Sequence, residues 1–299
     1  MTTLTILAPG GLTLVQDTGR AGLAHLGVGR AGAMDRTAHA LANRLVGNAP
    51  EAATLEILLG GFSAVIDSPV WFAITGAWGE LLLDGRPVEP HTATLAVAGS
   101  TLSLGPATAG LRYYLAVRGG IDVPPVLGSR SRDTLAALGP APLAAGDVIP
   151  IGTAPATPVP AVDLVPVGPP PADIDLQLRP GPRTGWFDAA SWQRLFTTQW
   201  QASARSDRTG IRLTAPSGTG DGSEAGVLQR TTSGELPSEG MVAGAMQVSP
   251  DGAPTILATD HPVTGGYPVI AVVTDASLDA LAQLRPGSTV RFTLATGHA

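Results

Sequence analysis

The sequence contains no cysteine and no lysine, and all eighteen of its basic residues are arginine. Without a thiolate, the chain has no disulfide, no sulfur-ligated metal and no cysteine nucleophile. Without a lysine, it forms no Schiff base, carries no biotin, and lacks the cation that a Walker-type phosphate loop requires. These absences exclude several classes of catalyst before any motif is considered.

Aromatic residues are also scarce, at 4% of the chain, and no apolar run approaches the roughly 18 residues that a membrane span requires. The first residues show no basic segment followed by an apolar one, as a signal peptide would. The formal charge is −6, and no arginine-rich face with interleaved aromatics is evident. We therefore expect a cytoplasmic protein that acts on a small molecule and binds neither nucleic acid nor membrane.

Short apolar runs separated by Gly or Pro recur from one end of the chain to the other. Their length and flanking turn residues favour strands, so the predicted class is mainly β with a few short helices. Apolar residues at helical spacing predict one helix near residues 34–46, ended by Gly47. Weaker patterns predict helices from Asp188 and from Ser277.

Proline marks a boundary between two parts of the chain. Ten of the 27 prolines lie between residues 150 and 182, a density that the interior of a sheet does not tolerate. We interpret residues 153–178 as a Pro-rich linker. It separates an N-terminal β lobe, residues 1–152, from a C-terminal β lobe, residues 179–299.

The segment before the first predicted helix is rich in glycine. Residues 27–32, GVGRAG, have the glycine spacing of a dinucleotide fingerprint, but strands follow them instead of repeated β-α-β units, so we interpret them as a Gly-rich entry to the helix. On the helix, Asp35, His39 and Asn43 recur every fourth residue. They form either a solvated face or, on the alternative interpretation, a face that places Asp35 and Asn43 at a binding site.

Two turns carry arginine in a context that suits anion binding. VQDTGR ends at Arg20, directly after a predicted strand, and LGSRSRD contains Arg130. Guanidinium groups bind carboxylates and phosphates through paired planar hydrogen bonds. Arg20 and Arg130 are therefore candidates to bind a substrate, whereas SDRTGIRL, from Ser206, favours a salt-bridged hairpin.

The densest polar group lies in the last hundred residues. LPSEGMVAGAMQV contains Glu239 and Gln247, and TDHPVTGGYPV contains Asp260 and a Gly-Gly pair. The backbone N–H groups of paired glycines can reach a substrate oxygen, where one well-placed donor is worth about 3 kcal/mol. This pattern favours the edge of an active site over a simple hairpin. We predict as catalytic Glu239, Asp260 and Asp35, as substrate-binding Arg20, Asn43, Arg130, Gln247, Thr264, Gly265, Gly266 and Tyr267, and no metal site.

Taken in order, these motifs resemble those of a known family. VQDTGR, GRAGAMDRTAHALANRLVGN, LEILLGG, YYLAVRGGID, VLGSRS, SDRTGIRL, LPSEGMVAGAMQV and TGGYP are similar to the biotin-dependent carboxyltransferase family, whose members are also described as the C subunit of 5-oxoprolinase, allophanate hydrolase subunit 2 or Kip antagonist-like proteins. The resemblance covers residues 4–295. It implies a two-lobed, cyclophilin-like β-barrel architecture, with an active site at or near an interface with a partner of related fold.

The resemblance also implies a function. Similar free-standing proteins act with a related B subunit (KipI-like) and an A subunit (LamB/YcsF-like) in the ATP-dependent opening of 5-oxoproline, a cyclic amide, to glutamate. We therefore expect a hydrolase subunit, with ATP and magnesium at the level of the complex. Glu239 and Asp260 are then candidates for general acid/base work or for holding magnesium, while Gly265, Gly266 and Tyr267 position the reacting carbonyl.

Two other functions remain open. Members of the family that are fused into urea carboxylase move a carboxyl group from biotin, which another protein would carry here because this chain has no lysine. The third interpretation is a non-catalytic regulator that binds a kinase inhibitor.

Overall fold

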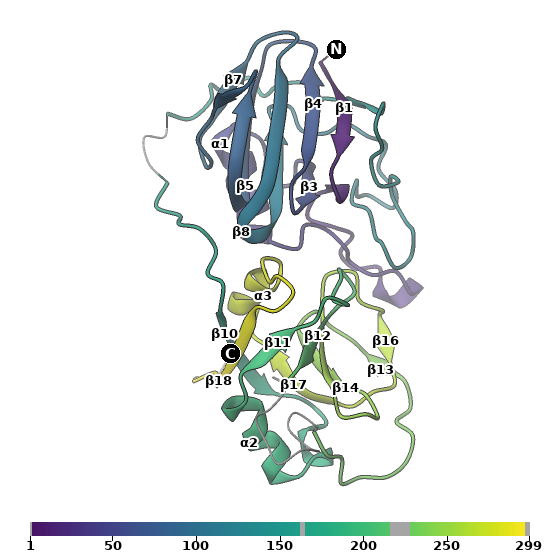
Figure 1. Cartoon of the computed structure of the whole chain (residues 1–299). Coiled ribbons are helices and arrows are strands. Elements are labelled where there is room, and N and C mark those ends of the chain that lie inside the picture. Colours follow the sequence, from purple (N-terminus) through teal and green to yellow (C-terminus); the bar gives the residue numbers. More distant parts are fainter. Residues whose placement is uncertain (1, 162–164, 216–227, 297–299) are drawn as a thin grey trace. The chain divides into compact units, whose positions relative to one another are not determined.

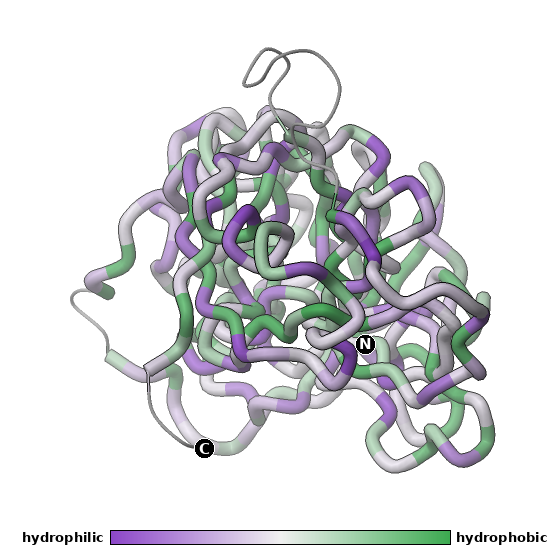
Figure 2. The backbone as a smooth tube through the Cα atoms, turned by 90° about the horizontal axis from the view of Figure 1, so that it is seen from below, coloured by the Kyte–Doolittle hydropathy of each residue, from purple (hydrophilic) through white to green (hydrophobic). Residues whose placement is uncertain are grey.

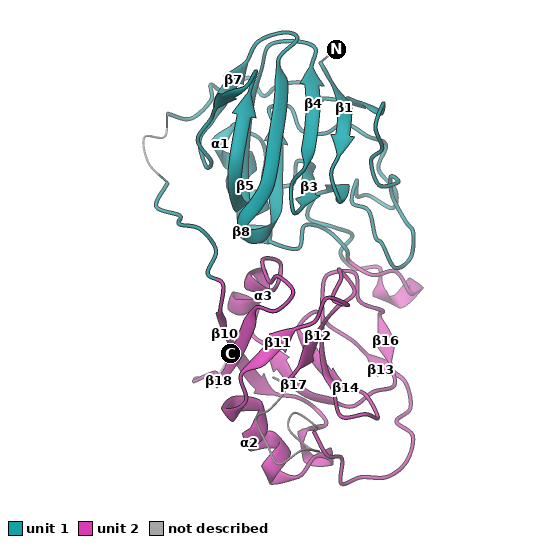
Figure 3. Ribbon diagram, in the orientation of Figure 1, with its two compact units in different colours: residues 1–21, 31–171 teal, residues 22–30, 172–299 magenta. Residues whose placement is uncertain are grey.

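The computed structural model describes residues 2–161, 165–215 and 228–296 (Figure 1). The chain divides into two compact units: unit 1 comprises residues 1–21 and 31–171, and unit 2 comprises residues 22–30 and 172–299 (Figure 3). The predicted linker therefore contributes residues to both units, and residues 162–164 of it lie outside the described part. Strands dominate both units and the helices are few and short, which confirms the predicted fold class.

Unit 1 contains one large sheet and one α-helix. Its strands are β1 (Thr3–Pro9), β2 (Leu12–Gln16), β3 (Thr54–Leu58), β4 (Phe62–Ile66), β5 (Val70–Leu83), β6 (Arg86–Pro87), β7 (Thr94–Ala96), β8 (Thr101–Val117) and β9 (Val148–Pro150). They form an antiparallel sheet of order β2-β3-β8-β4-β1-β9, and β5 pairs with β8, β6 and β7. The two longest strands, β5 and β8, pair from Phe72 opposite Val117 to Leu83 opposite Leu102.

The two faces of the β5–β8 pair are both covered. Successive side chains of a strand point to opposite faces, so Tyr113 enters the main apolar core of unit 1 while Tyr114 faces α1 (Arg36–Leu45). Ala38, Leu41 and Leu45 supply the buried face of the helix, at the helical spacing seen in the sequence. The helix is followed by Gly47, whose φ of 70° is in the left-handed region that glycine adopts without strain.

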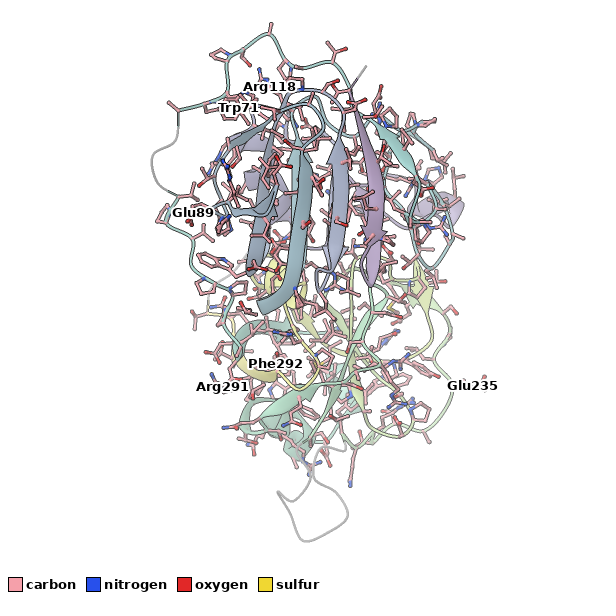
Figure 4. All side chains as sticks on the ribbon, turned by 45° about the horizontal axis from the view of Figure 1, so that its top comes forward. Trp71, Glu89, Arg118, Glu235, Arg291 and Phe292 are labelled. Atoms are coloured by element: carbon pink, nitrogen blue, oxygen red, sulfur yellow. The ribbon has the colours of Figure 1, made fainter. Side chains whose placement is uncertain are left out.

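Unit 2 is built on a closed barrel. Its strands are β10 (Ile174–Pro180), β11 (Trp200–Ala202), β12 (Gly210–Thr214), β14 (Ala245–Val248), β15 (Pro254–Leu257), β17 (Val269–Val273) and β18 (Thr289–Leu294), and they close in the order β10-β17-β14-β15-β12-β11-β18. On β10, buried and exposed side chains alternate from Ile174 to Leu178. On β18, Phe292 is buried, whereas Arg291 has 43% of its side chain exposed and pairs with Asp175 at 2.8 Å (Figure 4).

Short elements complete unit 2. The helices are η1 (Ala24–Leu26), η2 (Thr184–Trp186), α2 (Ala189–Thr197) and α3 (Asp275–Leu281), and β13 (Glu239–Gly240) pairs with β16 (Thr264–Gly265) in a separate two-stranded ribbon. α2 begins after Asp188, whose side chain accepts a hydrogen bond from the backbone N–H of Ser191, as expected of a helix cap.

Polar and apolar residues follow one another at short intervals along the described part of the chain, as Figure 2 shows. Among the described residues, no helix combines the length and the apolar character needed to cross a bilayer.

Candidate functional site

The buried carboxylate of Asp17 organises the turn that follows β2 in unit 1. It accepts hydrogen bonds from the hydroxyls of Ser129 (2.6 Å) and Ser131 (2.5 Å) and from the backbone N–H groups of Gly19 (2.8 Å) and Arg130 (2.6 Å). Burial acts to raise the pKa of Asp17, but the hydrogen bonds outweigh burial and hold that pKa below its ordinary value. Asp17 is thus an ionised group that fastens two loops together.

Arg20, a predicted substrate-binding residue, lies in the same turn and is only 2% exposed. Its Nε donates to the carbonyl of Val126 at 3.0 Å and its Nη2 donates to the carbonyl of Ser131. Its Nη1 is buried and has no hydrogen-bond partner. Arg20 therefore retains one unused donor.

Gln16, at the end of β2, has a buried acceptor atom that is not hydrogen-bonded. Its Nε2 donates to the carbonyl of Arg132 at 2.9 Å, whereas its Oε1 is buried without a hydrogen-bond partner. The VQDTGR motif in the sequence did not by itself identify Gln16 or Asp17 as site residues. The signal available was two acceptors and a guanidinium within five residues at the end of a strand.

Arg130, the other predicted guanidinium, has a different environment. Its Nη2 pairs with Asp122 at 2.8 Å and its Nε donates to the carbonyl of Val123, with more than a third of the side chain exposed. Only its backbone N–H reaches the Asp17 cluster. The structure thus places Arg20 and Arg130 on the same pair of loops but gives the two guanidinium groups separate partners.

The polar residues of α1 are buried, so the interpretation of a solvated face is wrong. Asp35 caps the helix by accepting from the backbone N–H of Ala38 at 2.8 Å. His39 Nε2 lies 3.1 Å from the carbonyl oxygen of Ala52, and Asn43 donates to the same oxygen at 2.8 Å. Burial lowers the pKa of His39, which keeps its ring neutral. These side chains join α1 to the segment before β3.

Glu56 of β3 is a buried acid that the sequence analysis missed. It accepts from the hydroxyl of Tyr114 at 2.8 Å and from the backbone N–H of Met34 at 3.0 Å, and it pairs with Arg112 at 3.5 Å. The Tyr114 hydroxyl in turn accepts from the backbone N–H of Asp35. Burial and then the Glu56 charge raise the pKa of Tyr114 well above its ordinary value. The sequence signal was one carboxylate inside the apolar run LEILL.

In unit 2, the β13–β16 ribbon brings several predicted residues together. Glu239 pairs with Gly265, and a Cβ at position 265 would lie only 2.6 Å from Nε2 of Gln247. Gln247 also donates to the carbonyl of Tyr267 at 3.3 Å. Thr264, Gly266 and Tyr267 are exposed, so this edge presents a backbone and one aromatic ring to solvent.

The carboxylate of Glu239 is held by Arg183, a residue that the sequence analysis did not select. Nε of Arg183 lies 3.3 Å from Oε2, and Nη2 donates to Oε1. The hydrogen bond from Arg183 lowers the pKa of Glu239, so the carboxylate is ionised at neutral pH. Arg183 also lies over the ring of Trp186, 5.6 Å from its centroid. The two ion-paired residues are 56 positions apart, so no local pattern links them.

Asp260 forms a buried pair with Arg208. Nε and Nη2 of Arg208 each contact one carboxylate oxygen at 2.9 Å, and the backbone N–H of Asp260 donates to the carbonyl of Arg208. The sequence favoured a salt-bridged hairpin at SDRTGIRL, and Arg208 does form an ion pair, but its partner lies 52 residues away. Both oxygens of Asp260 are thereby engaged.

Eleven residues were predicted for the site, and the structure distributes them between the units. Asp35, Arg20, Asn43 and Arg130 belong to unit 1, and the other seven belong to unit 2. Among the described residues, no group of three or more His, Asp or Glu side chains is arranged to hold a metal ion.

Comparison with known proteins agrees with the resemblance seen in the motifs. The chain is 38% identical to the C subunit of 5-oxoprolinase from Escherichia coli (strain K12), over 97% of this chain and 90% of the relative. It is 33% identical to urea amidolyase of Saccharomyces cerevisiae, over 97% of this chain but 16% of that longer protein. The crystal structure of the K. lactis urea amidolyase matches with a TM-score of 0.88 and 29% identity, over 98% of this chain and 19% of that chain.

A family model described as carboxyltransferase domain, subdomain A and B, matches residues 26–294. This match covers most of both units, and the relatives extend over nearly the whole chain. The chain therefore belongs to the carboxyltransferase domain family, subdomains A and B.

Proposed function

We propose that the protein is the C subunit of a cytoplasmic, ATP-dependent 5-oxoprolinase that opens 5-oxoproline to glutamate together with a related B subunit and an A subunit. The observation that carries this proposal is the match to the C subunit of E. coli 5-oxoprolinase, which includes 97% of this chain and 90% of the relative. The urea amidolyase match, by contrast, covers 16% of a much longer protein.

The reaction breaks the C–N bond of a lactam, which resonance stabilises. ATP, when bound to the complex, supplies the activation of the carbonyl oxygen. This chain's part is to bind and orient, and each unit is considered by itself. In unit 1, Arg20 and Arg130 bind a carboxylate or a phosphate. In unit 2, the backbone N–H groups at Gly265 and Gly266 donate to a carbonyl oxygen as charge develops on it. Gln247, Thr264 and Tyr267 shape that edge, and Asn43 orients its neighbour His39.

Three acids are proposed for proton transfer. Glu239 is the first candidate for a general base because its carboxylate is partly exposed, whereas Asp260 and Asp35 are buried. The hydrogen bond from Arg183 lowers the pKa of Glu239, so the carboxylate gains basicity only when that bond is released. Asp260 and Asp35 are buried, and each has hydrogen-bonding partners within the chain. For Asp35, a substitution that keeps a capping oxygen separates a role in proton transfer from a role in the helix cap. For Asp260, Asp260→Asn keeps the shape of the side chain and should abolish glutamate release if the carboxylate transfers a proton.

The described residues do not fit a magnesium site on this chain. Magnesium binds oxygen ligands in an octahedral arrangement, whereas Glu239 and Asp260 each contact a guanidinium group. No group of three metal-binding side chains occurs among residues 2–161, 165–215 and 228–296.

The test is reconstitution. The chain is co-expressed with its candidate A and B subunits, and glutamate release from 5-oxoproline is measured with and without ATP. We expect turnover only when all three subunits and ATP are present. In the matched variant Glu239→Gln we expect at least a tenfold loss of kcat, whereas Asp175→Asn, which removes an exposed acid of the same barrel, retains it.

A second function is favoured by the urea amidolyase matches, which include a solved structure at a TM-score of 0.88. It is transfer of a carboxyl group from biotin carried by another protein. Absence of glutamate release from the three-component assembly, together with carboxyl transfer from a biotinylated carrier, would replace the first proposal with this one.

A further inference from the structure

Arg20 carries a buried charge that the described residues do not balance. No carboxylate pairs with it among them, and its two bonded nitrogens contact only the carbonyl oxygens of Val126 and Ser131. Its Nη1 is closed off from solvent and has no acceptor. A buried cation without a counter-ion is costly, and an unmade hydrogen bond adds to that cost. An anionic ligand would balance this charge.

The nearest acid in the sequence, Asp17, does not supply that anion. Its carboxylate already accepts four hydrogen bonds, from the hydroxyls of Ser129 and Ser131 and from the backbone N–H groups of Gly19 and Arg130. Asp17 instead fixes the position of the loop that holds Arg20, since Ser131 both donates to Asp17 and accepts from Arg20.

Gln16 adds an acceptor of fixed orientation. Because Nε2 donates to the carbonyl of Arg132, the amide cannot turn without losing that bond, and Oε1 is left bare and buried. Gln16 and Arg20 are four residues apart, and they contact the carbonyls of consecutive residues, Ser131 and Arg132. The turn after β2 thus carries an unpaired cationic donor, Arg20 Nη1, and an unpaired neutral acceptor, Gln16 Oε1, and both side chains are bonded to residues 131–132.

We propose that Arg20 Nη1 and Gln16 Oε1 recognise the carboxylate and the adjacent lactam N–H of 5-oxoproline. In this substrate the carbon that bears the carboxylate is bonded to the lactam nitrogen, so an anionic acceptor and an N–H donor lie one carbon apart. The two unpaired protein atoms are complementary to these groups, since Arg20 Nη1 is a cationic donor and Gln16 Oε1 is an acceptor. This inference rests on the proposed function and deepens it, since it assigns substrate selection to the turn after β2.

Access to these atoms requires the neighbouring hairpin to move. Val126 and Ser129 bond to each other, and Leu127 and Gly128 between them have φ values of 54° and 82°. A leucine in the left-handed region is strained, so the closed turn is not at its backbone minimum. Release of the Val126 carbonyl from Arg20 opens the way to the guanidinium.

The test uses the reconstituted complex and two analogues as inhibitors of 5-oxoproline turnover. 2-Pyrrolidinone keeps the lactam and lacks the carboxylate, and the γ-lactone of 2-hydroxyglutarate keeps the carboxylate and has oxygen in place of N–H. For Arg20→Gln we expect KM for 5-oxoproline to rise at least tenfold, while the inhibition constant of 2-pyrrolidinone changes less than twofold. For Gln16→Met we expect KM to rise several-fold, with the inhibition constant of the lactone unchanged.

Arg118→Gln is the matched control. Arg118 is also a buried arginine of unit 1 that contacts only carbonyl oxygens, those of Val46, Pro155 and Thr157. Its substitution should lower the free energy of unfolding. The ratio of the KM for 5-oxoproline to the inhibition constant of each analogue should stay as in the wild type. If Arg20→Gln does not fold, Arg20→Lys is the second variant, because it keeps the charge and loses the planar pair of donors. It should still weaken the binding of 5-oxoproline more than the binding of 2-pyrrolidinone.

The outcomes separate this inference from the function on which it rests. In one outcome the variants still turn over 5-oxoproline, and the KM for 5-oxoproline and the inhibition constants of both analogues rise by the same factor or do not change. That outcome would show that the two unpaired atoms only serve the fold, for example through an internal water. That result overturns the inference and leaves the proposed function intact. A wild-type complex that does not open 5-oxoproline overturns both.

Discussion

The buried arginines Arg208, Arg118 and Arg20 have two kinds of hydrogen-bond partner, and the kind of partner predicts how much a substitution destabilises the fold. Arg208 has a carboxylate partner, whereas Arg118 and Arg20 have only carbonyl oxygens. Carbonyl oxygens satisfy the donors but do not neutralise the charge. Arg118 uses Nη1 and Nη2, and it lies beside Trp71, whose carbonyl accepts from the Arg118 backbone (Figure 4).

The Arg208–Asp260 pair is expected to matter most for stability. Arg208→Gln leaves the Asp260 carboxylate buried without its counter-ion, which should cost about 3–5 kcal/mol in the free energy of unfolding. Urea unfolding of unit 2 measures this. Arg291→Gln, which removes an exposed pair on β18, should cause little change. Equal effects of the two substitutions would contradict the assignment of Arg208 to a desolvated pair.

His39 should make the stability of unit 1 depend on pH. Its folded pKa is depressed, first by burial, below the ordinary value of 6.5. The unfolded chain therefore takes up a proton that the folded chain refuses, so stability is complete above about pH 6.5 and falls as the pH drops from there toward the folded pKa.

Hydrogen exchange of the α1 amides at pH 7.5, 6.5 and 5.5 measures this dependence. His39→Gln should flatten it. His91, whose pKa burial also lowers, titrates in the same direction, so His91→Gln is the companion variant. If protection in the wild type were to rise as the pH falls, the sign of the effect would be wrong.

At the scale of elements, the start of α1 separates a structural role of Asp35 from a catalytic one. Asp35→Ala removes the cap and should cost about 1 kcal/mol. Asp35→Ser keeps a capping oxygen and should retain most of that stability, whereas a catalytic carboxylate would be lost in both variants. Thermal unfolding and glutamate release, measured on both variants, distinguish the structural role from the catalytic one. Full turnover in Asp35→Ser would confine Asp35 to the cap.

The β13–β16 ribbon offers a matched pair of glycines. A Cβ at Gly265 would displace the side-chain amide of Gln247, whereas a Cβ at Gly240 meets nothing within 4 Å. Because the amide is the end of a flexible side chain, Gly265→Ala should change stability by no more than about 1 kcal/mol but should lower turnover about tenfold. Gly240→Ala should behave as the wild type in both assays. Equal activity of the two variants would remove Gly265 from the site.

The elements themselves were largely predictable from the sequence. Alternating apolar residues on β8, and the spacing of Ala38, Leu41 and Leu45 on α1, identify a strand and a helix because the periods differ. The two-residue strands β13 and β16 have no period to detect, and the partners of Glu239 and Asp260 lie more than 50 residues away. Polar residues at every fourth position of α1 are compatible with a solvated face or with a binding site, and only the tertiary structure shows that they are buried.

At the scale of the whole molecule, the sequence predicted two β parts and a Pro-rich segment between them. What it did not indicate is that Arg118 binds the carbonyls of Pro155 and Thr157, which fixes the first part of that segment to unit 1. A guanidinium 37 residues away from its acceptor leaves no mark in local composition. The sequence also did not indicate that residues 22–30 belong to unit 2.

The barrel should fold without the rest of the chain. All seven of its strands lie between Ile174 and Leu294, and they close on one another. We expect a fragment of residues 172–299 to unfold in one cooperative transition, as followed by circular dichroism during urea titration. A broad, non-cooperative transition would show that the strand ring alone does not suffice.

The assignment of residues 22–30 to unit 2 has a practical consequence for protein engineering. The polypeptide passes between the units after residues 21, 30 and 171. A chimera of two relatives joined only at residue 171 would therefore combine one parent's barrel with the other parent's nine-residue insert. Exchanging specificity between family members cleanly requires three junctions, because the portable module is discontinuous in the gene.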